Sequence, residues 1–157
     1  MQRRVVVVAA AEDQVAHDHV AGGGDGDALR AAGIAYEHMP GLGGLRHTHA
    51  DSPNKGWRNA SFRGYADYMQ TEEFEEGLEE LIAAASETRI AIMCAEGNPY
   101  RCHRNLVADA LTARGIPVYH ISSRKTARLH RLTPFARVEN GRVSYPEQVN
   151  QSAEKSV

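Results

Sequence analysis

The strongest constraint on the fold comes from residues 89–122, which follow the pattern of a strand, a tight loop, a helix and a second strand. The run 89–94 is short and mostly apolar, which is typical of a strand buried on both faces of a sheet. Asn98 suits an N-cap, Pro99 the first helical position, and Gly115 the end of the helix. A strand, a crossover helix and a strand of this size predict a right-handed βαβ unit.

The side chains able to do chemistry gather where the first of these strands meets the helix. They are Cys94, Glu96, Arg101, Cys102, His103 and Arg104. Parallel α/β sheets bind their ligands at the carboxyl ends of the strands, beside helix N-termini. We therefore expect the functional site at this junction.

Three other segments complete the expected fold. Residues 5–11 suit a first buried strand, and Thr71 caps an amphipathic helix. Asn140-Gly141 lies between two short alternating runs, which is a strong signal for a β-hairpin with a type I′ turn. We predict a three-layer, Rossmann-like α/β fold with a mostly parallel sheet and a C-terminal β-hairpin.

The segment CAEGNPYRCHRNLVADAL, residues 94–111, closely resembles the signature of the domain-of-unknown-function family 488. In that signature a strand ends in Cys-Ala-Glu and a helix begins at Cys-His-Arg. Further similar segments are residues 33–36, 42–44, 62–65 and 141–146. The resemblance implies a single α/β domain over residues 28–148, and it gives a family without an activity.

Residues 1–27 depart from the pattern of that family. Related chains would open with a strand, a helix and a second strand, whereas residues 13–27 show neither helical nor strand periodicity. The two interpretations are a diverged or lost N-terminus and a wrongly framed start. We expect an atypical N-terminal segment, then the domain, then a polar tail over residues 149–157.

Charge is distributed unevenly along the chain. The formal net charge is −2, but residues 94–137 carry eight Lys or Arg against two acids, and residues 72–80 carry six glutamates. A local positive excess favours an anionic ligand, a small molecule or a nucleic acid. The alternative is a solvated surface whose two signs cancel across the molecule.

Composition excludes two classes of protein. Two cysteines do not make a disulfide scaffold, and no apolar run approaches the length of about eighteen residues that a membrane span needs. We expect a cytoplasmic protein with reduced thiols and no membrane partner. The sequence indicates neither a cofactor nor an oligomeric state.

The junction suits an enzyme that binds an anion. The helix start offers free N–H groups, and Arg101 and Arg104 lie on one helical face, where they can hold a phosphate. Cys94 in this positive field can act as a nucleophile, with Glu96 or His103 as general acid or base. The spacing from Cys94 to Arg101 and the missing Gly-rich cradle exclude the standard loop of cysteine-dependent phosphatases. The ligand that we expect still bears a phosphate group and is a nucleotide or a nucleic acid.

Two other segments are candidate walls of this site. The long loop 40–60 contains Gly43 and Gly44, which permit close backbone approach to a ligand. Arg63 and Tyr65 combine a cation with an aromatic ring, which suits a phosphate contact and base stacking. The alternatives are a glycine turn without a ligand and half-buried packing residues.

Three alternatives to the enzyme hypothesis remain. Cys94, Cys102 and His103 can supply three metal ligands, but adjacent residues point about 100° apart on a helix, which disfavours this hypothesis. His47, His49 or Glu96 would complete such a shell. The basic surface can also belong to a non-catalytic nucleic-acid or nucleotide-binding protein. Finally, the thiols can be inert packing residues, which we favour for Cys102 and not for Cys94.

Overall fold

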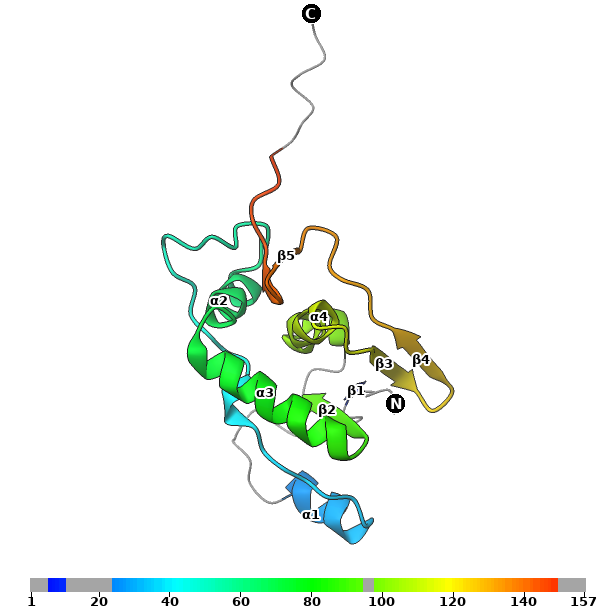
Figure 1. Cartoon of the computed structure of the whole chain (residues 1–157). Helices are drawn as coiled ribbons and strands as arrows, with labels where there is room; N and C mark the ends of the chain where they lie inside the picture. Colours follow the sequence, from blue (N-terminus) through cyan, green and yellow to red (C-terminus); the bar gives the residue numbers. More distant parts are fainter. Residues whose placement is uncertain (1–5, 11–23, 95–97, 150–157) are drawn as a thin grey trace, which may run out of the picture.

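The computed structural model describes residues 6–10, 24–94 and 98–149 of the 157-residue chain. The described part contains both helices and strands, with three α-helices between the first two strands and four strands after the last helix (Figure 1). The elements are β1 (Val6–Ala10), α1 (Gly24–Ala31), η1 (Pro40–Leu42), α2 (Ala60–Tyr68), α3 (Glu72–Glu87), β2 (Ile90–Cys94), η2 (Pro99–Arg101), α4 (Arg104–Ala113), β3 (Val118–Ser123), β4 (Thr126–Leu129), β5 (Arg137–Glu139) and β6 (Arg142–Ser144).

The main sheet has the strand order β2-β1-β3-β4. The predicted first strand is confirmed as β1, and it lies between β2 and β3 and parallel to both. The helix α4 connects β2 to β3, so the strand–helix–strand unit is present with β1 inserted between its two strands. β4 pairs antiparallel with β3 at the edge.

The C-terminal hairpin is confirmed. β5 and β6 pair antiparallel in a separate two-stranded sheet. Asn140 and Gly141 have φ values of 51° and 77°. A type I′ turn requires two consecutive residues in this left-handed region, which the Asn-Gly pair adopts readily.

The expected three-layer, Rossmann-like sheet is wrong, although the mixed α/β character is correct. Ile90 and Ile92 of β2 pack against the core, whereas Ala91 and Met93 on the opposite face are exposed. A sheet between two helical layers would bury both faces. The short apolar run 89–94 therefore forms a strand that is buried on one face, in a sheet of four short strands.

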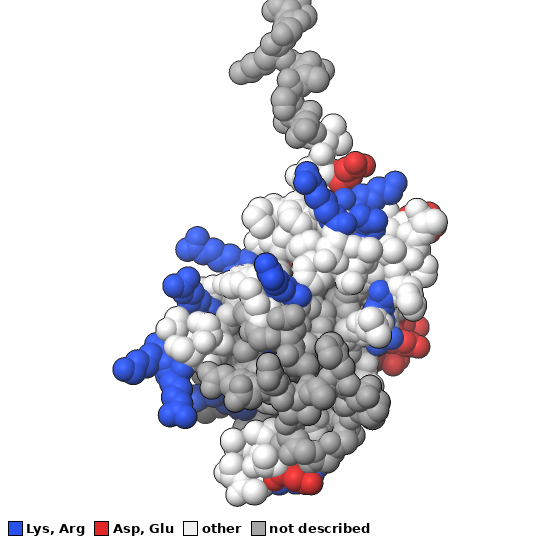
Figure 2. Space-filling view, turned by 180° about the vertical axis from the view of Figure 1, so that it is seen from behind, with Lys and Arg blue, Asp and Glu red and all other residues white. Residues whose placement is uncertain are grey.

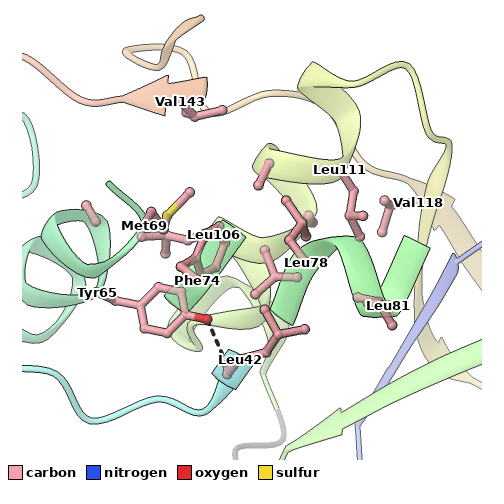
Figure 3. Close-up of a cluster of buried hydrophobic side chains, with 14 of the residues drawn as sticks. Leu42, Tyr65, Met69, Phe74, Leu78, Leu81, Leu106, Leu111, Val118 and Val143 are labelled. Carbon is pink, nitrogen blue, oxygen red and sulfur yellow. Dashed lines mark hydrogen bonds between the residues drawn. The ribbon is translucent and has the colours of Figure 1, made fainter. Parts of the chain in front are cut away.

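The core lies between α2, α3, α4 and the inner face of the sheet. Figure 3 shows side chains from these helices meeting, with Leu78 and Leu81 from α3, Leu106 and Leu111 from α4, and Val118 from β3. The predicted helix α3 begins after Thr71, whose side chain accepts a hydrogen bond from the Phe74 N–H. Its apolar stripe and the apolar side chains of α4 belong to the same core.

Polar contacts anchor the long loop between η1 and α2. Asn54 is fully buried, donates to Asp67 Oδ1 at 2.8 Å and accepts from the Tyr145 N–H at 2.9 Å. Ser52 donates to the same carboxylate oxygen at 2.5 Å. One side-chain network therefore ties this loop to α2 and to the chain after β6.

The expected atypical N-terminal segment and polar tail fall largely on residues 11–23 and on residues beyond 149, which lie outside the described residues. Within the described part, no helix combines the length and the apolar character needed to cross a membrane.

Candidate functional site

The structure brings together three of the chemistry-bearing residues at the carboxyl end of β2. Cys94 is the last residue of β2, and Cys102 and His103 lie between η2 and α4. The two Sγ atoms and a ring nitrogen of His103 all lie within 4.8 Å of one another. We refer to Cys94, Cys102 and His103 as the thiol–imidazole cluster.

The argument that Cys102 and His103 diverge on a helix is wrong. Both residues precede α4, which begins at Arg104, and their backbone forms a bend and a turn. Their side chains therefore converge, with Sγ of Cys102 3.5 Å from Nδ1 of His103. By ligand type and spacing, the thiol–imidazole cluster can hold a metal ion.

Arg104 is buried beside this cluster rather than presented at the surface. Its side chain is 1% exposed, and its Nε donates to Sγ of Cys102 at 3.3 Å. Its backbone N–H, at the start of α4, donates to the same sulfur at 3.5 Å. The positive end of the helix and the guanidinium are therefore both directed at a sulfur atom of the protein.

The two thiols interact directly. A hydrogen bond with Cys94 and, next, burial raise the pKa of the Cys102 thiol well above its ordinary value, against the opposing effect of the Arg104 hydrogen bonds. Cys102 thus keeps its proton and shares it with Cys94. Cys94, the partner in this hydrogen bond, is half-buried.

The expected walls of the site partly surround His103. A Cβ on Gly44 would lie 2.7 Å from Nδ1 of His103, so the backbone of this loop lies against the imidazole. The ring of Tyr65 has its centroid 5.1 Å from that of His103. Tyr65 donates its hydroxyl hydrogen to the Leu42 carbonyl, and burial raises its pKa. The uncharged phenol of Tyr65 therefore forms one wall of the site beside His103.

The other predicted residues have different surroundings. The Arg63 guanidinium donates to the Trp57 carbonyl at 2.9 and 3.1 Å, which holds the start of α2 against the preceding loop. Gly43 accepts from Nε of Arg46 through its carbonyl. Arg101 is exposed in η2, next to Cys102 in the chain. Glu96 lies outside the described residues.

A buried polar chain that the sequence did not single out runs beside this site. Nε2 of His120 lies 2.7 Å from Nδ1 of His130, whose Nε2 lies 2.7 Å from Oδ1 of Asp109. The apolar alternation of residues 116–121 indicates only that position 120 faces the core. The sequence signal for this chain is weak, because it consists of one histidine at an inward-facing position near a strand end.

Most of the predicted positive charge is exposed. Figure 2 shows Lys and Arg side chains projecting at the edge of the molecule where the β3–β4 hairpin lies, and others elsewhere on the same face. The exposed cations of residues 94–137 are Arg101, Arg124, Lys125, Arg128, Arg131 and Arg137. Arg114 pairs with Glu75 instead. A pocket of about 330 Å³ lies beside the β5–β6 hairpin, and none of its lining residues belongs to the thiol–imidazole cluster.

Comparison with known proteins gives a family and no activity. The model of the family described as Domain of unknown function DUF488 matches residues 26–111, which include the whole thiol–imidazole cluster. No curated protein matches the chain, and no solved structure matches it. The family match covers more than half of the sequence, and the chain therefore belongs to the Domain of unknown function DUF488 family.

Proposed function

We propose that this protein is an enzyme that acts on a phosphate-bearing ligand, a nucleotide or a nucleic acid, with Sγ of Cys94 as the nucleophile. The observation that carries the proposal is the buried Arg104 side chain, whose Nε lies 3.3 Å from Sγ of Cys102. A cation and a helix N-terminus directed at a sulfur atom favour the thiolate form of a neighbouring thiol. The thiol pair beside Arg104 is therefore placed to hold a thiolate.

Cys94 is a better nucleophile than Cys102. Cys102 is 4% exposed, and its raised pKa keeps it protonated. Cys94 is half-buried at the end of a strand, where a ligand can reach it. A thiolate on Cys94 would accept the Cys102 proton as a hydrogen bond and lie in the field of Arg104.

The surroundings of the cluster favour an anion over a metal cation. Sγ of Cys102 accepts two hydrogen bonds from Arg104, which places the guanidinium beside any ion bound at the cluster. The guanidinium also repels a divalent cation. Beyond the contact between Arg104 and Cys102, Arg101 and the exposed cations of the β3–β4 segment provide positive charge suited to a phosphate group.

His103 can serve this chemistry as an acid or base. Its ring is held between the Gly44 backbone and Tyr65, and its Nδ1 lies beside Sγ of Cys102. Proton transfer by a positioned imidazole typically contributes a factor of about 100 or more to a rate. We retain Glu96 as a second candidate from the sequence pattern alone.

The test is the rate of iodoacetamide alkylation of each thiol as a function of pH, followed by mass spectrometry of the digested protein. We expect Cys94 to react with a midpoint below the free-thiol value of about 8.5, and Cys102 to remain unmodified. Cys102→Ser should keep Cys94 reactive and shift that midpoint. Inert thiols would contradict a nucleophilic Cys94, and reactivity only after addition of a chelator would indicate a metal site.

Orthovanadate, a phosphate analogue, tests the ligand class in the same assay. We expect it to protect Cys94 from alkylation, and Arg101→Met to weaken that protection. Absence of protection, together with binding of a DNA or RNA oligonucleotide that weakens steeply with salt, would favour the non-catalytic nucleic-acid-binding function.

A further inference from the structure

His120, His130 and Asp109 form a continuous chain of hydrogen bonds in the interior of the protein. His120 and His130 are 3% and 6% exposed, and Asp109 is fully buried. Both links of the chain are 2.7 Å long. The sequence does not place these three residues together, because they come from α4, from β3 and from the segment after β4.

The partners of Asp109 determine where the protons of the chain lie. Its Oδ1 accepts from the Thr133 N–H at 3.0 Å, and its Oδ2 accepts from the hydroxyls of Thr133 and Tyr145 at 2.7 Å each. A carboxyl group that accepts this many hydrogen bonds is an ionised carboxylate. With His130 as a neutral imidazole, its Nε2 donates to Asp109 and its Nδ1 accepts the Nε2 proton of His120.

This arrangement leaves a bare lone pair on Nδ1 of His120. That atom is buried and has no hydrogen-bond partner among the residues that the structure describes. Buried polar atoms normally have a partner, and an exception requires an explanation. An acceptor left open beside an active site is explained by a donor that arrives with the ligand or with reacting water.

The position of His120 connects it to the thiol–imidazole cluster. Val8 of β1 pairs with Ile92 on one side and with His120 on the other, so His120 lies on the same face of the sheet as Ile92 and, one alternation further, Cys94. Its ring centroid is 5.4 Å from that of Tyr100, in the same η2 segment that leads into Cys102.

The groups that face His120 keep it neutral at neutral pH. Burial, and next electrostatic interaction with His130 and Arg104, lower the pKa of His120 to about 4, against the opposing effect of Asp109. A neutral imidazole retains the lone pair that a base needs. Asp109 is placed to stabilise positive charge on His130 instead.

We propose that His120 is a general base of this active site, and that His130 and Asp109 are positioning residues that relay the proton it accepts. The inference rests on the proposed function of Cys94. The Cys94 thiolate attacks the phosphorus of a phosphate ester, which forms an S–P bond and breaks the P–O bond to the leaving group. His103, as general acid, gives its proton to the leaving oxygen, which departs as the alcohol, and His103 then regains a proton from solvent. Water then attacks phosphorus and gives a proton to Nδ1 of His120, while the Nε2 proton of His120 moves to Nδ1 of His130. The S–P bond breaks, its electron pair returns to sulfur as the thiolate, and inorganic phosphate leaves.

The test is stopped-flow hydrolysis of p-nitrophenyl phosphate by the full-length protein. In the wild type we expect a burst of p-nitrophenol followed by steady turnover. His120→Gln should retain the burst and lower the steady rate by about 100-fold or more, because only the water step needs the base. His130→Gln should lower the steady rate less and shift its pH profile. His38→Gln, which changes an exposed histidine far along the chain, is the matched control and should leave both phases unchanged.

Two outcomes separate this inference from the proposed function. Equal steady turnover in wild type and His120→Gln, with a burst in both, overturns the role of His120 and leaves Cys94 as the nucleophile. Absence of burst and turnover in the wild type contradicts the proposed function. The proton positions that the relay requires are tested separately by the imidazole ¹⁵N shifts of His120 in the wild-type protein, which do not depend on the folding of a variant. A proton on Nε2 alone at neutral pH supports the relay, and a proton on Nδ1 overturns it.

Discussion

Gly44 lies directly against His103: a Cβ at position 44 would come within 2.7 Å of Nδ1 and 3.0 Å of Cε1 of the imidazole. Real Cβ atoms do not approach other atoms so closely, so one of the two groups would have to move. The long loop after η1 is thus part of the wall of the thiol–imidazole cluster. The expected close approach of a glycine backbone occurs here, and its partner in this structure is a side chain of the protein.

The first prediction concerns this contact. Gly44→Ala should destabilise the protein by roughly 1–3 kcal/mol, because the added methyl group displaces the His103 ring from a packed position. Urea unfolding measures the loss, and the ¹⁵N–¹H correlation of His103 should shift. Gly41→Ala is the control, since its Cβ would meet its nearest atoms at 3.6 and 3.7 Å, an ordinary contact. Equal stability of the two variants would contradict the contact.

The second prediction concerns the buried guanidinium. Arg104→Met keeps much of the side-chain volume and removes the hydrogen bond from Nε to Sγ of Cys102. The thiolate of the pair then loses a nearby cation, and alkylation of Cys94 at neutral pH should slow by about tenfold or more. Arg101→Met, which removes an exposed cation three residues earlier, is the control. Its alkylation rate should stay within about twofold of the wild type. A fast Arg104→Met variant would show that Arg104 does not act on the thiols.

The local patterns of the sequence predict individual elements well. The Thr71 cap, the apolar stripe of α3 and the Asn140-Gly141 turn are fixed by residues close in the chain, and each forms as expected. The local patterns do not predict the number of layers in the fold. The run 89–94 contains apolar residues on both faces of its strand, and only the tertiary structure decides that Ala91 and Met93 are exposed.

The candidate site shows the same division. The crowding of Cys94, Cys102 and His103 follows from chain neighbourhood and the strand–helix junction, so the sequence finds it. The burial of Arg104 does not follow, because an arginine at a helix start is normally exposed. The link from His120 through His130 to Asp109 joins distant segments. No short pattern encodes it.

The third prediction concerns the network that anchors the long loop. Burial raises the pKa of the Asp67 carboxyl, but hydrogen bonds from Ser52, Asn54 and the His49 N–H outweigh this effect, and its pKa is lowered from its ordinary value of 3.8. The folded state thus binds the proton less readily than the unfolded state. The stabilisation is present above that ordinary value and is lost as the pH falls through the lowered pKa.

Asp67→Asn tests this network. At neutral pH it should reduce the free energy of unfolding by roughly 1–3 kcal/mol, and it should flatten the dependence of stability on pH below about 4. Asp51→Asn, which changes an exposed carboxylate of the same loop, is the control and should leave the curve unchanged. Parallel curves for wild type and Asp67→Asn in the acid range would contradict the assignment.

The fourth prediction concerns His120 and does not depend on any activity. Burial first, and then electrostatic interaction with His130 and Arg104, lower its pKa to about 4, below the ordinary value of 6.5. The unfolded state therefore takes up a proton at a higher pH than the folded state. The stability that His120 contributes is fully present above about pH 6.5 and is lost as the pH falls toward its folded pKa.

Urea unfolding at a series of pH values from about 7 to 4 measures this effect. Wild-type protein should lose roughly 3 kcal/mol more than His120→Gln over this range, because glutamine takes up no proton. His38→Gln, at an exposed position, should follow the wild type. If wild type and His120→Gln lose stability in parallel, then His120 is protonated as readily in the folded as in the unfolded state.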